Sequence, residues 1–100
     1  MLISKSKSSY DAGDVITFKL VNGDEIIARL VEQTSTGFVV DRPCTVMPSA
    51  KGIGLIQSMF TSETSKKVDL HSQHVLMHAP TIKDMVAHYT KTTSGIELVV

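Results

Sequence analysis

Histidines are the first residues in this 100-residue chain that could do chemistry. His74 and His78 are four residues apart, a spacing that puts two metal ligands on one face of a helix. The apolar residues 75–77 between them and the following Pro80 favour a strand instead, where the two side chains lie about 13 Å apart. His71 is close in sequence, but no cysteine or paired carboxylate completes a zinc-binding set. We therefore predict no metal site, and histidines that face solvent or form hydrogen bonds.

Cys44, the only cysteine, could act as a nucleophile. No local motif pairs it with a base, and an isolated cysteine is commonly a small buried hydrophobic residue. Gly52-Ile53-Gly54 has the Gly-x-Gly spacing of phosphate-binding loops, but no strand–turn–helix pattern surrounds it. The carboxylates are scattered, and no pair of them is suited to acid–base catalysis. We predict no catalytic residue, no cofactor and no enzymatic activity.

Charge, hydropathy and the cysteine count limit the possible partners and compartments. Ten basic and ten acidic residues give a net charge of zero, whereas non-specific DNA binding depends on a basic excess. No apolar run approaches the roughly 20 residues of a membrane-spanning helix, and the first residues lack the apolar core of a secretory signal. A single cysteine fits a reducing compartment. The sequence therefore predicts a cytoplasmic protein that binds neither DNA nor membranes.

The elements that would position these residues begin with a β-meander over 15–43. Apolar and polar residues alternate along 15–20, which is the period of a half-buried strand. Asn22-Gly23 then predicts a two-residue type I′ turn, which needs positive φ at both positions. A second strand runs to a break at 34–37, and a third begins at Phe38. The pattern predicts three antiparallel strands in a strongly bent sheet.

The rest of the chain predicts further strands and one helix. Residues 52–60 are apolar on both faces, as in a central strand or a subunit contact. The segments 67–70 and 74–77 predict two short strands around a tight loop. Thr81 then predicts a helix N-cap, and Gly95 predicts the C-cap. The apolar face of this helix consists of Ile82, Met85, Val86 and Tyr89.

These elements predict a single domain over residues 1–100. It comprises a loose N-terminal segment (1–12), a barrel (13–80), a C-terminal helix with its cap (81–95) and a tail strand (96–100). A chain of this length matches one domain, and small domains commonly gain stability by oligomerisation.

The stretch FKLVNGDEIIARL, followed by a turn and Phe38-Val39-Val40, resembles the first sequence motif of the Sm and Sm-like proteins, most closely that of the bacterial Sm-like RNA chaperone. The strands at 67–70 and 74–77 stand where this family has its second motif. The helix that contains Tyr89 and the Thr-Ser-Gly-Ile tail at 93–96 are similar to those of small Sm-like proteins of marine bacteriophages. The resemblance implies a mainly β fold, namely a small, five-stranded, strongly bent antiparallel Sm-like barrel with a C-terminal helix.

The resemblance also implies an RNA site, because the family binds RNA at the loops after the second and fourth strands. A base would stack on Phe38, Gln73 and His74 would make polar contacts, and Lys67 would lie near a phosphate. The two loops lack the Asp, Asn and Arg-Gly residues of the eukaryotic members. The alternative is that Phe38 is a core residue and His74 merely follows a turn, and the sequence leaves both interpretations open.

The same resemblance implies self-assembly. The family covers its open sheet edges by pairing the fourth strand of one subunit with the fifth strand of the next. We therefore expect a homo-oligomeric ring of about five to seven subunits. The expected interface residues are Ile53, Leu55, Ile56, Met59, Val75 and Met77. Two functions follow: a non-enzymatic ring that binds single-stranded RNA, or a structural or protein-interaction ring that has lost RNA binding.

Overall fold

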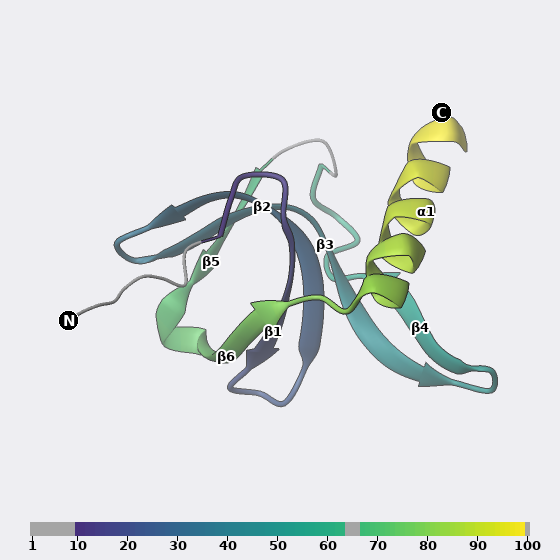
Figure 1. Ribbon diagram of the computed structural model, residues 1–100, viewed down its shortest axis with the longest axis horizontal. Coiled ribbons are helices and arrows are strands. Elements are labelled where there is room, and N and C mark those ends of the chain that lie inside the picture. The colour runs from purple at the N-terminus through teal and green to yellow at the C-terminus, as the bar shows by residue number, and fades with distance from the viewer. Residues whose placement is uncertain (1–9, 64–66, 100) are drawn as a thin grey trace.

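The computed structural model describes residues 10–63 and 67–99, so most of the predicted loose segment at 1–12 lies outside the described residues. The described chain forms six strands, a short 3-10 turn (η2) and one helix (Figure 1). Their bounds are β1 Val15–Leu20, β2 Glu25–Thr34, β3 Gly37–Ser49, β4 Gly52–Gln57, β5 Lys67–His71, η2 Ser72–His74, β6 Val75–Pro80 and α1 Lys83–Val99. The predicted mainly β, antiparallel fold with a C-terminal helix is confirmed.

The strands form one antiparallel sheet in the order β4-β3-β2-β1-β6. The long strand β3 has β2 along one edge, and its other edge pairs with β5 in its first half and with β4 in its second half. The sheet bends without closing, because no strand of the described residues joins β6 to β4 or β5. The predicted strongly bent antiparallel sheet is confirmed, but it does not close into a complete barrel, and the strand predicted over 52–60 ends at Gln57.

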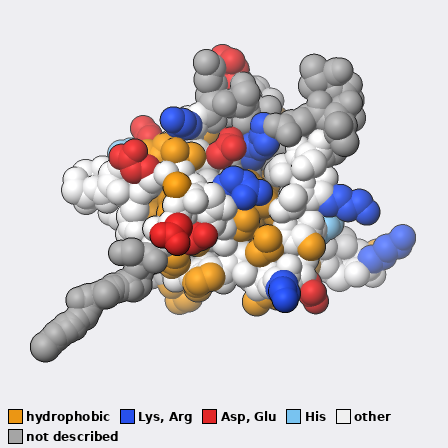
Figure 2. Space-filling view, turned by 45° about the horizontal axis from the view of Figure 1, so that its top comes forward, with side chains coloured by type: hydrophobic (Ala, Val, Ile, Leu, Met, Phe, Trp, Pro, Cys, Tyr) orange, Lys and Arg blue, Asp and Glu red, His pale blue; other side chains and the backbone are white. Residues whose placement is uncertain are grey.

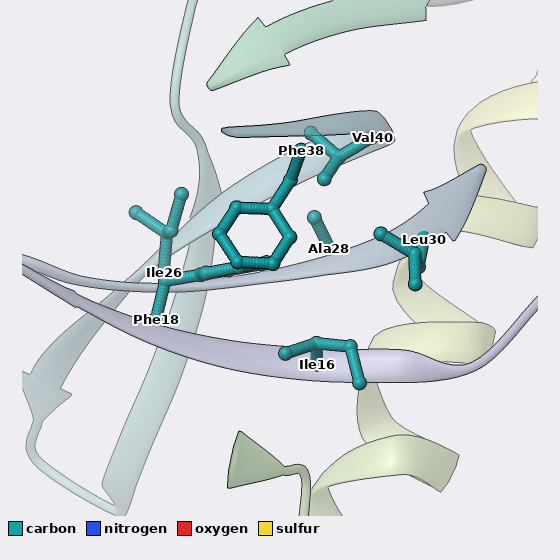
Figure 3. Packing of buried hydrophobic residues seen from close by; sticks show 7 residues of the cluster. All are labelled: Ile16, Phe18, Ile26, Ala28, Leu30, Phe38 and Val40. Carbon is teal, nitrogen blue, oxygen red and sulfur yellow. The ribbon is translucent and has the colours of Figure 1, made fainter. Parts of the chain in front are cut away.

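One face of the sheet encloses the larger cluster of buried apolar side chains. Its members come from β1, β2 and β3 and are Ile16, Phe18, Ile26, Ala28, Leu30, Phe38 and Val40 (Figure 3). The rings of Phe18 and Phe38 meet edge to face, with 4.9 Å between their centroids. Burial of one large apolar side chain stabilises a fold by about 1.5–3 kcal/mol, so this cluster is the main source of the stability of the sheet.

The helix α1 covers the opposite face of the sheet through a second cluster. Its buried members are Val15, Ile27, Cys44 and Tyr89, and Met85 and Val86 of the helix pack against them. The predicted helical face is thus confirmed except at Ile82, whose side chain is exposed because it precedes the helix.

A β-bulge in β3 explains why this helix carries a tyrosine. The β2–β3 register shifts between Ile27 and Arg29, and Arg42 on the bulged strand has a φ of 49°. The Tyr89 hydroxyl accepts a hydrogen bond from the Arg29 N–H at 3.2 Å and lies 3.0 Å from the carbonyl oxygens of Asp41 and Arg42, to which its one proton can be donated. This hydroxyl therefore serves backbone groups that the bulge takes out of the regular ladder.

The ends of α1 differ from the sequence prediction. Thr81 is not the N-cap, because its N–H donates to the Val15 carbonyl at 3.0 Å and its hydroxyl hydrogen-bonds the Thr17 hydroxyl at 2.8 Å, which keeps it on the sheet. The C-cap at Gly95 and the tail strand over 96–99 are also wrong, since the helix continues to Val99, and residue 100 lies outside the described residues. A glycine inside a helix costs only about 1 kcal/mol, and each further helical residue adds a hydrogen bond.

The β1–β2 turn also differs from the prediction. Gly23 has a φ of 97°, but Asn22 does not have a positive φ, so the turn is not type I′. The Gly23 N–H donates to the Leu20 carbonyl at 2.9 Å, and the Leu20 N–H donates to the Asp24 carbonyl at 2.8 Å. These bonds define a three-residue loop with glycine in the left-handed position. The Asn22 side-chain oxygen accepts the Asp24 N–H at 2.9 Å, which holds the loop in this form.

Candidate functional site

The two loops that the sequence singled out meet in space. The Ser72 N–H at the start of η2 donates to the carbonyl of Thr36, in the β2–β3 turn, at 2.9 Å. Gly37 ends this turn, and a Cβ atom there would collide with the Leu70 carbonyl oxygen of β5. Only glycine allows the two loops to approach so closely. The structure thus joins segments that are about 35 residues apart in the sequence.

A hollow of about 540 Å³ lies beside these loops and is called here the β6 hollow. Its walls are the β2–β3 turn, η2 and the first part of β6, with lining residues Gln33, Thr34, Ser35, Gly37, Phe38, Ser72, Val75, Leu76, Met77 and His78. None of these is Lys, Arg, Asp or Glu, and His78 is the one titratable side chain among them. The walls therefore suit an uncharged group better than a phosphate.

The predicted RNA-contacting residues are only partly brought together. Phe38 is 5% exposed and packs against Phe18 and His78, so most of its ring is unavailable to a base. Gln73 and His74 are exposed on η2 at the rim of the β6 hollow, without lining it. Lys67 pairs with Asp41 at the far end of β5, about 13 Å along the strand from His71.

The histidines do not form a metal site, and His74 lies in η2 rather than in the predicted strand. His78 instead hydrogen-bonds through Nδ1 to the Tyr10 hydroxyl at 2.6 Å and lies near the rings of Phe18 and Phe38. Among the described residues, no group of three or more His, Cys, Asp or Glu is placed to hold a metal ion.

Cys44 is a buried free thiol in the helix-side cluster. Burial raises the pKa of this thiol, so at neutral pH it stays protonated. Its Sγ contacts only the Arg42 carbonyl as a hydrogen-bond acceptor, at 3.8 Å. The side chain therefore behaves as a small core residue and not as an activated nucleophile.

The free edges of the sheet carry exposed apolar side chains. On β4 and just beyond it these are Ile53, Ile56, Met59 and Phe60, and on β6 they are Leu76 and Met77. Leu55 and Val75, which were also expected at an interface, are only partly exposed because they pack against the two core clusters. The exposed residues of β5 are charged or polar instead, namely Lys67, Asp69 and His71.

Phe60 and Leu76 were absent from the predicted interface. Phe60 is 71% exposed, the highest value among the large apolar residues of the described chain, and Leu76 is 61% exposed. The sequence predicts Phe60 in a strand, where one face would be covered, but Phe60 follows the end of β4 in an irregular segment. The polar run that follows it in the sequence was the available signal that the strand had ended.

The surface charge is mixed. On the face turned forward in Figure 2, Lys and Arg side chains are interspersed with Asp and Glu side chains, without a field of one sign. This arrangement agrees with the net charge of zero. Within residues 10–63 and 67–99, no helix has both the length and the apolar character needed to cross a membrane.

A scan against protein-family models and a search of curated proteins found no match to this chain. Its relation to the Sm-like proteins is therefore a proposal. The support for it is the hairpin motif in the sequence.

Proposed function

We propose that this chain is an Sm-like subunit that assembles into a homo-oligomeric ring and acts without catalysis as a structural or protein-interaction scaffold. The observation that supports it is the exposure of apolar side chains along two strands, β4 and β6, whose outer edges have no partner strand among the described residues. Such edges pair with other chains unless they are blunted by charge or covered. The edge of β5, with its charged residues, is blunted in this way.

Pairing of β4 with β6 of a neighbouring copy would bury both apolar edges at once. A contact between two different edges of the same chain is heterologous, and it generates a ring when the rotation closes. A ring of about five to seven subunits agrees with the family resemblance. The buried, reduced Cys44 is compatible with the cytoplasmic location that we propose for the assembly.

Light scattering after size exclusion tests the ring at micromolar concentration. We expect a mass of several subunits for the unmodified chain and a monomer for Ile56→Lys, because a buried unpaired charge opposes association. Val21→Lys is the matched control, since Val21 is also exposed and apolar but lies in the β1–β2 turn, where its N–H bonds the His74 carbonyl on the side of β6 that faces β1 and not on the outer edge. A monomeric unmodified chain would refute the ring.

Single-stranded RNA binding by this ring is the second candidate. The observation in its favour is the contact between the β2–β3 turn and η2, which sets Gln73 and His74 beside the β6 hollow. Fluorescence titration with short U-rich and A-rich RNA tests it at low salt. If RNA binds here, the variant Gln73→Ala/His74→Ala loses affinity, whereas Lys67→Ala at the other end of β5 retains it. An intact ring that binds neither RNA would exclude this candidate.

A further inference from the structure

Phe60 and the β6 hollow are complementary features at different places on the same chain. Phe60 is a large, uncharged and mostly exposed side chain, and the hollow of about 540 Å³ has walls without an acidic or basic residue. An aromatic side chain loses roughly 150–250 Å² of accessible surface when it is fully buried. In the single chain Phe60 meets water, and so does the apolar part of the hollow, which consists of Val75, Leu76 and Met77 beside polar residues of the β2–β3 turn.

The free backbone groups of the two edge strands would let Phe60 of one copy meet the β6 hollow of another copy. The Ser58 N–H donates to the Pro43 carbonyl at 3.0 Å, so alternate residues of β4, including Leu55, direct their backbone groups away from β3. The Thr81 N–H donates to the Val15 carbonyl, and by the same alternation His78 directs its backbone groups away from β1. Antiparallel pairing of these two edges can therefore align Leu55 of one copy with His78 of the next.

This alignment places the end of β4 beside the start of β6. With Leu55 opposite His78, Gln57 lies opposite Leu76, and Phe60 follows three residues later, within about 10 Å. Leu76 lines the β6 hollow, and so do its neighbours Val75 and Met77. Phe60 of the first copy thus reaches the mouth of the hollow on the second.

We propose that Phe60 of each subunit inserts into the β6 hollow of the next subunit, so that the hollow is completed by the partner copy rather than by RNA. This inference rests on the proposed ring. Stable interfaces bury about 1,000 Å² or more in total, and two paired six-residue strands offer limited side-chain contact. Insertion of Phe60 adds buried area to that strand pairing. A central aromatic residue in an uncharged pocket is the usual form of an interface anchor.

Disulfide cross-linking tests the insertion directly. The double variant Phe60→Cys/Leu76→Cys carries one cysteine at the position of the inserted side chain and one at the mouth of the hollow. Oxidation with copper phenanthroline should give a ladder of covalent multimers on a non-reducing gel, because facing cysteines within about 7 Å between Cα atoms can form a disulfide. The parent chain should give none, since Cys44 is buried.

A second pair separates failure of the insertion from failure of the ring. Ile53→Cys/Pro80→Cys reports strand pairing at the opposite ends of β4 and β6, away from the hollow, because the same alignment sets Ile53 opposite Pro80. If this pair cross-links and the first does not, the ring stands and the insertion of Phe60 is refuted. If light scattering shows a monomer, the ring and the insertion both fail. If U-rich or A-rich RNA added before oxidation suppresses only the first pair, RNA takes the hollow and the assignment to Phe60 is wrong.

Discussion

The sheet face beneath α1 and the outer edges of β4 and β6 both carry apolar side chains, yet the described chain covers only the first of them. Under α1, Val15, Ile27 and Cys44 are buried, and the Tyr89 hydroxyl serves the backbone groups of the β-bulge. Along the edges, Ile53 and Met77 are 55% and 65% exposed. The difference separates a surface that the chain covers by itself from surfaces that it leaves exposed.

The same difference predicts where substitutions act. Changes under α1 should lower the free energy of unfolding of the single chain, because they remove contacts made within it. Changes at the edges should leave that free energy nearly unchanged and act on assembly.

Tyr89→Phe should lower the free energy of unfolding by about 3 kcal/mol. The hydroxyl bonds the Arg29 N–H and lies between two carbonyl oxygens, and each buried backbone group left without a partner costs about 1–3 kcal/mol. Urea denaturation followed by circular dichroism measures the loss. Tyr10→Phe is the control, since its hydrogen bond to His78 is exposed, and it should cost about 1 kcal/mol at most. Equal losses in both variants would contradict the role of Tyr89 at the bulge.

Alkaline pH should weaken the same region. Burial raises the pKa of Tyr89 to about 12, so the folded state favours the neutral phenol. The resulting stability is fully present below the unfolded pKa of about 10 and is lost as the pH rises through 12, by roughly 2 kcal/mol at pH 12. Urea denaturation from pH 8 to 12 should show this decline in the parent chain and a smaller one in Tyr89→Phe, while Tyr10 titrates in both. Equal declines in the parent chain and in Tyr89→Phe would show that ionisation of Tyr89 does not cause the alkaline loss of stability.

Thr81→Val should cost about 1 kcal/mol, because it leaves the Thr17 hydroxyl without its partner at the junction of β6 and α1. The double variant Thr17→Val/Thr81→Val should recover most of this loss, since replacing both partners leaves neither hydroxyl unpaired. A double-mutant cycle from thermal unfolding measures the coupling. If the two losses simply add, the hydroxyl pair contributes nothing.

Two residues of β4, Leu55 and Ile53, should show most clearly the difference between the covered sheet face and the exposed edge. Leu55 packs against the helix-side cluster, so Leu55→Ala should cost about 2 kcal/mol, whereas exposed Ile53→Thr should change the free energy of unfolding by less than about 0.5 kcal/mol. Both are measured in the Ile56→Lys background, which is expected to be monomeric. A large loss from Ile53→Thr would mean that the edge is already covered within the chain.

Elements whose signals are local could be predicted from the sequence. The alternation in 15–20, the glycine at position 23 and the break at 34–37 specify the first three strands, and the spacing of Met85, Val86 and Tyr89 specifies the buried helical face. These signals depend on residues a few positions apart, and therefore they can be recognised without knowledge of the fold. The apolar character of 52–60 was also visible, although not the end of its strand.

Features that depend on contacts between distant residues could not be predicted from the sequence. Phe38 became a core residue because Phe18 and His78 enclose its ring, and Thr81 stayed on the sheet because Val15 and Thr17 hold it. The bulge at Arg42 has a local signal in the adjacent Pro43, which cannot donate to the ladder, but the role of Tyr89 there is evident only once the helix lies over the bulge. The β6 hollow likewise requires β6 to return beside the β2–β3 turn, a contact across about 40 residues that no local pattern encodes.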